Sequence, residues 1–122
     1  MISVKVDGMA KTLVFLKLKN KNAEQQVKKG ITKATVFLHG EVKQSIAGHR
    51  AEYISVDTGR FLNSVEFQVD KLTGKVFSKV PYAGKLEFGT GFHDSPRKHF
   101  TNSADRSKPK ITDLIKKEVQ YI

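Results

Sequence analysis

The sequence contains no cysteine and no tryptophan, and only three of its residues are proline. Without cysteine, neither disulfide bonds nor thiolate metal sites can stabilise the fold, which is typical of proteins that work in a reducing compartment. No apolar run approaches the roughly 20 residues that cross a bilayer, and the N-terminus lacks the charged and apolar regions of a signal peptide. We therefore expect a protein made in the cytoplasm that does not bind membranes.

Acidic residues are also scarce, because 12 Asp and Glu stand against 22 Lys and Arg, a net charge of +10. Residues 1–50 carry ten basic and three acidic residues, residues 51–96 five and six, and residues 97–122 seven and three. A basic surface attracts nucleic acid, acidic membranes or acidic proteins. Most of these cations are lysine, whereas phosphate and base recognition favours arginine. A solvated lysine face is therefore the simpler interpretation.

The length of 122 residues fits one domain, which we assign to residues 1–122. Alternating apolar and polar residues predict a short strand over 2–6. Apolar residues at steps of three and four predict a long helix from about 23 to 47. Residues 9–18 fit either a helix or a buried strand, and we favour a helix.

A second alternating pattern predicts a β-hairpin over residues 64–80, with its turn at 71–74. Pro81 suits the start of a short helical turn. The last helix is expected to begin near residues 107–109, with Pro109 in its first turn. Together these elements predict an α+β fold, in which a small antiparallel sheet (the hairpin plus the N-terminal strand) packs against the long helix and an amphipathic C-terminal helix.

Few residue patterns indicate chemistry. His93, Arg97 and His99 lie close enough in sequence to suggest a nuclease or phosphotransfer site, although an exposed loop is the commoner explanation. Residues 89–91 are too short for a phosphate-binding loop, and no third metal ligand accompanies the histidines. We therefore predict no catalytic, cofactor-binding or metal-binding residues.

The central part of the sequence instead indicates architecture. Asp57 or Thr58 can cap a turn, Gly59 can adopt a backbone conformation that other residues avoid, and Arg60 can pair with a carboxylate. Phe92 and Phe100 flank the basic loop, and exposed aromatic residues of this kind are common partner contacts.

Three motifs occur in a fixed order. They are Val56-Asp57-Thr58-Gly59-Arg60, then Tyr82-Ala83 with Glu87-Phe88-Gly89-Thr90-Gly91, then Pro96-Arg97 with Phe100. In this order the chain resembles the neck or tail-completion proteins of long-tailed bacteriophages, a family of putative minor tail components that join head and tail. The match spans most of residues 2–122, although Ser55 stands where the family usually has proline.

The resemblance implies an α+β structural protein of the virion at the head–tail junction, and no enzyme. It implies a ring around the DNA channel, with further copies of the chain and connector or tail-tube proteins as partners. The expected interface residues are Asp57, Thr58, Gly59, Arg60, Glu87, Phe88, Gly89, Thr90, Gly91, Phe92, Arg97 and Phe100.

Two other functions stay open from the sequence. The first is a small basic module that binds nucleic acid, for which Lys28, Lys29 and Lys33 are the candidate residues to face DNA. The second is a ribonuclease-type toxin that uses His93 and His99. In a ring the same lysines could contact DNA non-specifically in the lumen, so the first alternative overlaps with the structural role.

Overall fold

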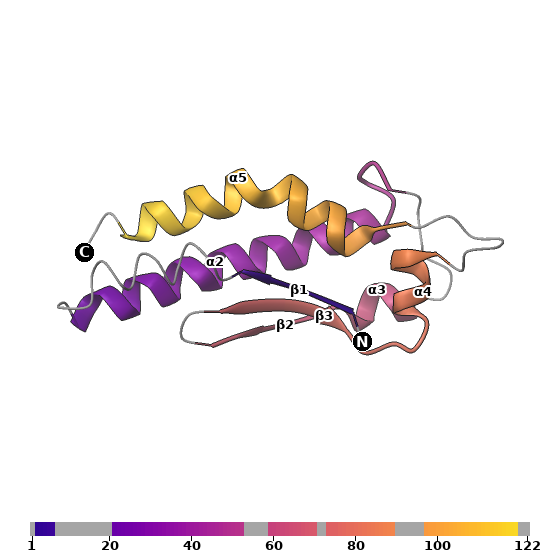
Figure 1. The fold of residues 1–122 in the computed structure, drawn as a ribbon, viewed down its shortest axis with the longest axis horizontal. Coiled ribbons are helices and arrows are strands. Elements are labelled where there is room, and N and C mark those ends of the chain that lie inside the picture. Colours follow the sequence, from indigo (N-terminus) through magenta and orange to yellow (C-terminus); the bar gives the residue numbers. More distant parts are fainter. Residues whose placement is uncertain (1, 7–20, 53–58, 71–72, 90–96, 120–122) are drawn as a thin grey trace.

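The computed structural model describes residues 2–6, 21–52, 59–70, 73–89 and 97–119. It confirms the α+β class, because a three-stranded antiparallel sheet packs against a long helix and a C-terminal helix (Figure 1). The helix expected over 9–18 lies outside the described residues. The elements are β1 (Ile2–Val6), α2 (Lys21–Ile46), α3 (Arg60–Ser64), β2 (Glu66–Val69), β3 (Gly74–Ser78), α4 (Ala83–Phe88) and α5 (His99–Val119).

Helix α2 confirms the long helix that the apolar spacing predicts, and it forms the centre of the core. From Val27 to Ile46 one side of it is mostly apolar and almost fully buried, while the opposite side faces solvent. No helix among the described residues has both the length and the apolar character of a membrane span. The buried α2 side chains that form this stripe are Val27, Ile31, Ala34, Leu38, Val42 and Ile46.

Strand β3 is the middle strand of the sheet, between β1 and β2. Gly74, expected in the hairpin turn, instead begins β3, where it lies opposite Val6 on β1 and Val69 on β2. A Cβ atom at this position would lie 1.7 Å from Oγ1 of Thr35, which is fully buried on α2. Glycine here therefore lets the sheet pack directly on the helix.

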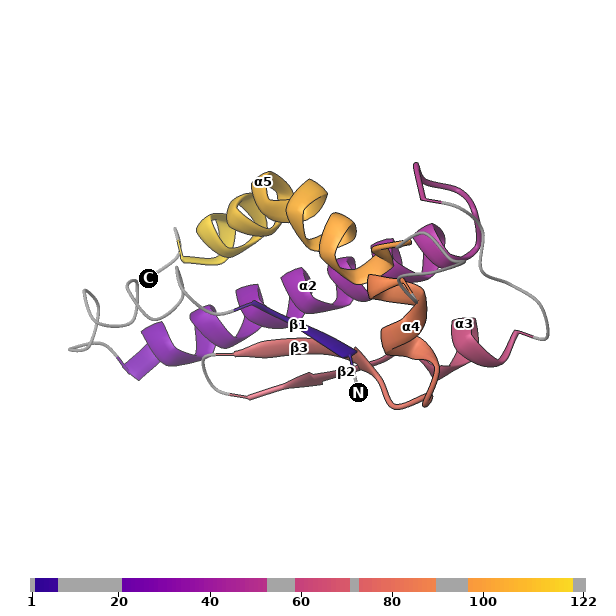
Figure 2. The same cartoon turned by 45° about the vertical axis from the view of Figure 1, so that its right-hand side comes forward.

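Helix α5 starts eight residues before the position that the sequence predicts. The expected start near Ser107 is wrong, because the helix begins at His99 and Ser107 lies buried within it. The two long helices run antiparallel, with α2 between α5 and the sheet (Figures 1 and 2). They approach closely at Gly30, where a Cβ atom would lie 3.1 Å from Cα of Ile115.

Pro109 lies inside α5 rather than in its first turn. Proline lacks the N–H that would bond to the carbonyl four residues earlier, so this position costs helix stability. Both Pro109 and Asp105, whose carbonyl loses that bond, are exposed, so water can take the place of the missing donor. Solvent exposure therefore explains why the helix continues through proline.

The packing at Gly74 generates a prediction with a matched control. Gly74→Ala should lower the free energy of unfolding by about 1–3 kcal/mol, because the added methyl overlaps the Thr35 side chain. Gly40→Ala should raise it by about 0.5–1 kcal/mol, because Gly40 lies in α2 with no atom within 4 Å of an added Cβ. Urea denaturation of both variants measures the two changes, and effects of the same sign would contradict the packing.

Candidate functional site

The described parts of the three motifs meet at one end of the molecule, beside the C-terminal end of α2 (Figure 2). Phe61, in α3, is at the centre of this meeting point. Its ring centroid lies 6.0 Å from that of Tyr82, 6.1 Å from His99 and 6.4 Å from Phe100. These four aromatic side chains, which we call the end cluster, join segments that are distant in sequence into one packed unit.

Two glycines shape the chain around the end cluster. Gly59 has a φ of 81° and precedes α3, where its carbonyl accepts a hydrogen bond from the N–H of Asn63 at 2.9 Å. Gly89 has a φ of 79° and ends α4, and its N–H donates to the carbonyl of Lys85 at 2.8 Å. Positive φ values favour glycine because a Cβ atom would clash with the backbone. The sequence prediction for Gly59 is therefore confirmed.

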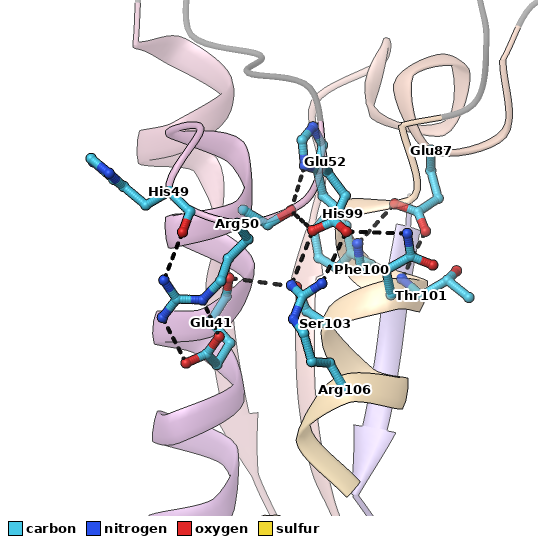
Figure 3. A network of polar contacts seen from close by, with 12 residues as sticks. Glu41, His49, Arg50, Glu52, Glu87, His99, Phe100, Thr101, Ser103 and Arg106 are labelled. Carbon is cyan, nitrogen blue, oxygen red and sulfur yellow. Dashed lines mark hydrogen bonds and ion pairs between the residues drawn. The ribbon is translucent and has the colours of Figure 1, made fainter.

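Glu87 connects α4 to α5 through its side chain. The residue is only 1% exposed. Its Oε1 atom accepts a hydrogen bond from the N–H of Phe100 at 2.9 Å, and Oε2 accepts one from the N–H of Thr101 at 2.8 Å (Figure 3). The first N–H groups of a helix have no partner within the helix, and a carboxylate there also faces the positive end of the helix dipole. Glu87 thus caps α5 from another element.

Backbone hydrogen bonds strengthen the same connection. The N–H of Arg97 donates to the carbonyl of Leu86 at 2.9 Å, and the N–H of Lys98 donates to that of Glu87 at 3.2 Å. Lys98 has a φ of 53°, the one positive value among the described residues other than glycine. We call residues 83–89 together with 97–101 the α4–α5 bracket.

The outer side of the bracket is aromatic and basic. Phe88 is 64% exposed, although Glu87 next to it is buried. Lys85 lies one helical turn before Phe88, and Lys98 is exposed on the adjoining segment. The guanidinium carbon of Arg60 lies 5.9 Å from the centroid of the Tyr82 ring, within cation–π range.

A partly buried polar network lies behind the bracket, between the chain that follows α2 and helix α5 (Figure 3). The Glu52 carboxylate accepts hydrogen bonds from both terminal nitrogens of Arg106, at 2.9 and 3.0 Å. Ser45 and Asn102 donate to the same carboxylate at 2.5 and 3.2 Å. This paired geometry anchors residue 52 to α5.

The chain after α2 is also attached to α2 itself. Arg50 donates to both carboxylate oxygens of Glu41, at 2.7 and 3.0 Å, and to the carbonyl of His49 at 2.9 Å. The hydrogen bond from Arg50 lowers the pKa of Glu41, and that from Glu41 raises the pKa of Arg50. Residues 49–52 are thus held by one ion pair to each long helix.

The hydroxyl of Ser45 also lies 2.7 Å from Nδ1 of His99. A serine hydroxyl has one proton, so the donation to Glu52 assigns the proton of this contact to Nδ1 of His99. Burial lowers the pKa of His99, although the nearby Glu87 and Glu52 carboxylates oppose the change. In a catalytic triad the imidazole lies between hydroxyl and carboxylate. Here the hydroxyl lies between them and is fully buried, so the arrangement does not create an activated nucleophile.

The charge on Glu52 is stabilised by its partners. Burial by itself would raise the pKa of this carboxyl group, but hydrogen bonds from Arg106, Ser45 and Asn102 outweigh burial and lower the pKa from 4.5 to about 2. Glu52 is therefore ionised at neutral pH, and its role is to fix the chain rather than to exchange protons.

The structure groups part of the expected interface and corrects another part. Gly59, Arg60, Phe88, Gly89 and Arg97 lie in or beside the bracket. Five other expected interface residues lie outside the described residues: Asp57, Thr58, Thr90, Gly91 and Phe92.

Glu87 and Phe100 are not surface contacts of this subunit, contrary to the sequence prediction. Glu87 is 1% exposed because it caps α5, and Phe100 is fully buried because it packs on Phe61. Their side chains hold the bracket together from inside, which leaves Phe88 as the described aromatic residue of the motifs that faces solvent.

The other sequence candidates lie elsewhere or do not meet. Lys28, Lys29 and Lys33 are exposed on the N-terminal half of α2, and Lys33 pairs with Glu118 on α5. His99 is fully buried, which removes it from any solvent-facing nuclease site with Arg97, and His93 lies outside the described residues. Within the described ranges, no group of three or more His, Asp or Glu residues is placed to hold a metal ion.

Sequence reasoning missed the network of Glu52 and Arg106, which lie 54 residues apart. One signal was present: Ser45 occupies an apolar position of the α2 stripe, three residues after Val42, and is fully buried. A buried hydroxyl requires a hydrogen-bond partner, but the spacing does not reveal which one. Comparisons with protein-family models, with curated proteins and with solved structures found no match to this chain.

The Glu52 network predicts a specific pH dependence of stability. Because the pKa of Glu52 in the folded protein, about 2, lies below the ordinary value of 4.5, the unfolded chain takes up the proton first as pH falls. This contribution, on the order of 3 kcal/mol, is complete above about pH 5 and is lost as pH falls through 2. Glu52→Gln should be less stable at neutral pH and should lose less stability on acidification.

Denaturation of the wild type and of Glu52→Gln across this pH range provides the measurement. Asp105→Asn, at an exposed carboxylate on α5, is the control that should keep the full acid response. Parallel stability curves for wild type and Glu52→Gln would contradict the assigned role.

The helix cap predicts the effect of a near-isosteric change. Glu87→Gln removes the charge and aims an amide N–H₂ at a backbone donor, so one of the two hydrogen bonds is lost. We expect a decrease of about 1–3 kcal/mol in the free energy of unfolding. Glu66→Gln, on the exposed side of β2, should change stability by less than about 0.5 kcal/mol. Equal stabilities for the two variants would show that Glu87 does not cap α5.

Proposed function

We propose that the protein is a structural virion protein of a tailed phage or prophage that acts at the head–tail junction as a ring-forming subunit around the DNA channel. The observation that carries the proposal is the α4–α5 bracket. The residues that carry the family resemblance are used in the bracket and directly beside it for a helix cap, two positive-φ glycines and aromatic packing. These are the contributions of a rigid scaffold that presents a surface, and they do not create a reactive group.

A ring subunit needs two different contact surfaces, because each subunit contacts the next one head to tail. Such contacts form a closed ring when a rotation relates successive subunits. The outer side of the bracket, with exposed Phe88, offers one. The margin of α2 and β2 offers a second, where Val36 and Phe67 are 46% and 45% exposed. Phe67 packs against His39 there with ring centroids 5.1 Å apart, so its position is fixed. The two surfaces lie on different elements, as a heterologous contact requires.

The basic charge is compatible with a DNA channel. Lys28 and Lys29 are exposed on α2, at a distance along the helix from the bracket. In a ring, lysines on such a face contact phosphates non-specifically without base recognition. Binding of this kind weakens steeply with salt, so any DNA affinity of the isolated chain should disappear at physiological ionic strength. The double variant with Lys28→Ala and Lys29→Ala should lack this affinity at low ionic strength as well.

The assembly test uses the full chain with purified portal-complex and tail-tube proteins of the same phage or prophage. We expect ring-shaped complexes in negative-stain images, and we expect deletion of the gene to yield filled heads separate from tails. Infectious particles that form normally without the gene, together with no affinity for any of these proteins, would contradict the proposal. A monomer in isolation would not, because neck subunits can require a docking platform.

A further inference from the structure

Phe88 is the most exposed large apolar side chain among the described residues, at 64% against 46% for Val36 and 45% for Phe67. Leaving a phenylalanine in water forgoes the stabilisation that burial of its side chain would provide. Scattered exposed apolar residues are common and need no explanation. Three features of its surroundings set Phe88 apart.

The first feature is rigidity. Phe88 is the last residue of α4, and the residues on either side of it are tied down. Glu87 is bonded through its carboxylate to the start of α5 and through its carbonyl to Lys98, and the N–H of Gly89 is bonded to Lys85. The ring is therefore presented on a fixed backbone, which reduces the entropy lost on binding.

The second feature is the charge around Phe88. Lys85 and Lys98 are exposed beside it. Within the described residues 59–65, 79–89 and 97–104, Glu87 is the one carboxylate, and both of its oxygens are directed at the buried N–H groups of α5. The described surface around the ring therefore presents cations only.

The third feature is the backbone of Lys98. Its φ of 53° lies in the left-handed region, which glycine adopts more readily than lysine. Strained backbone of this kind is concentrated at functional sites. Glycine at position 98 would relieve the strain. The presence of lysine there instead indicates that the lysine side chain has a role.

We infer that Phe88, with Lys85 and Lys98 at its rim, is a docking surface for an acidic protein that offers an apolar pocket for the phenylalanine ring. The inference rests on the proposed joining function and specifies the chemistry of the partner at this surface. A buried aromatic anchor surrounded by a charged rim is the usual anatomy of a binding hot spot. Complementary charge at the rim accelerates association and excludes basic partners.

A protein fits this surface better than a nucleic acid does. Proteins that bind single strands stack successive bases on several aromatic side chains along a groove. Here, within the part of this end that the structure describes, the ring of Phe88 is the strongly exposed one, and it projects from a helix of six residues. A single projecting ring matches a pocket rather than a row of bases.

The first test uses a displayed library of a small folded scaffold with a randomised concave surface, selected against the full-length protein. We expect the selected binders to be rich in Asp and Glu around an apolar centre. Phe88→Ala should weaken them about thirtyfold or more. Lys110→Ala, at an exposed position of α5 outside both proposed contact surfaces, is the control and should leave their affinity unchanged. Binders that tolerate Phe88→Ala or lack acidic enrichment would overturn the inference.

Lys98→Gly separates a binding role from a structural one. It should keep or raise stability, because the positive φ suits glycine, while it weakens the same binders about threefold or more and reduces their salt dependence. Lys108→Ala, at an exposed lysine on α5, is the control for charge alone. Lys98→Gly with unchanged affinity would contradict a rim contact, and tight single-stranded DNA binding that Phe88→Ala abolishes would replace the protein partner with nucleic acid.

The complexes with portal and tail-tube proteins distinguish this inference from the proposed function. If those complexes form and withstand both Phe88→Ala and Lys98→Gly, the joining function stands and the docking surface is wrong. If no such complex forms while selected acidic binders still require Phe88, the surface stands and the joining function is wrong.

Discussion

Two hydrogen bonds, from the backbone N–H groups of Phe100 and Thr101 to the Glu87 carboxylate, hold the start of α5. They fix where α5 begins relative to α4, in a sequence that offers a more obvious helix start eight residues later. Arg106 follows His99 by seven residues, about two helical turns, and so reaches Glu52 on the chain that leaves α2. One carboxylate thus sets the position of the helix, and the helix then holds the neighbouring chain.

The same interactions affect which charges the described residues around Phe88 expose. Glu87 is buried, and both of its oxygens accept hydrogen bonds from backbone N–H groups of α5, whereas Glu52 pairs with Arg106 on the same helix. Internal stability and an outward positive charge around Phe88 therefore arise from one arrangement, which connects the architecture of the motifs to their proposed use in assembly.

Patterns of local spacing predicted the elements whose stabilising contacts repeat along the chain. The α2 stripe, β1 and the hairpin follow from periodicity, and the α+β class follows from them. The start of α5 could not be predicted, because its cap comes from Glu87 in another element, and neither could the Glu52–Arg106 pair. Phe100 was expected at the surface for the same reason: sequence shows that an aromatic residue is present, but only the meeting of α3 and α5 determines that it is buried.

Amide hydrogen exchange of Phe100 and Thr101 shows whether the motif residues build a rigid bracket. N–H groups in the first turn of an uncapped helix exchange rapidly, because water is their only partner. Both amides should be protected to the same degree as those in the middle of α5. Exchange of these two amides as fast as in an unfolded chain, while the rest of α5 stays protected, would show that Glu87 does not hold the start of the helix.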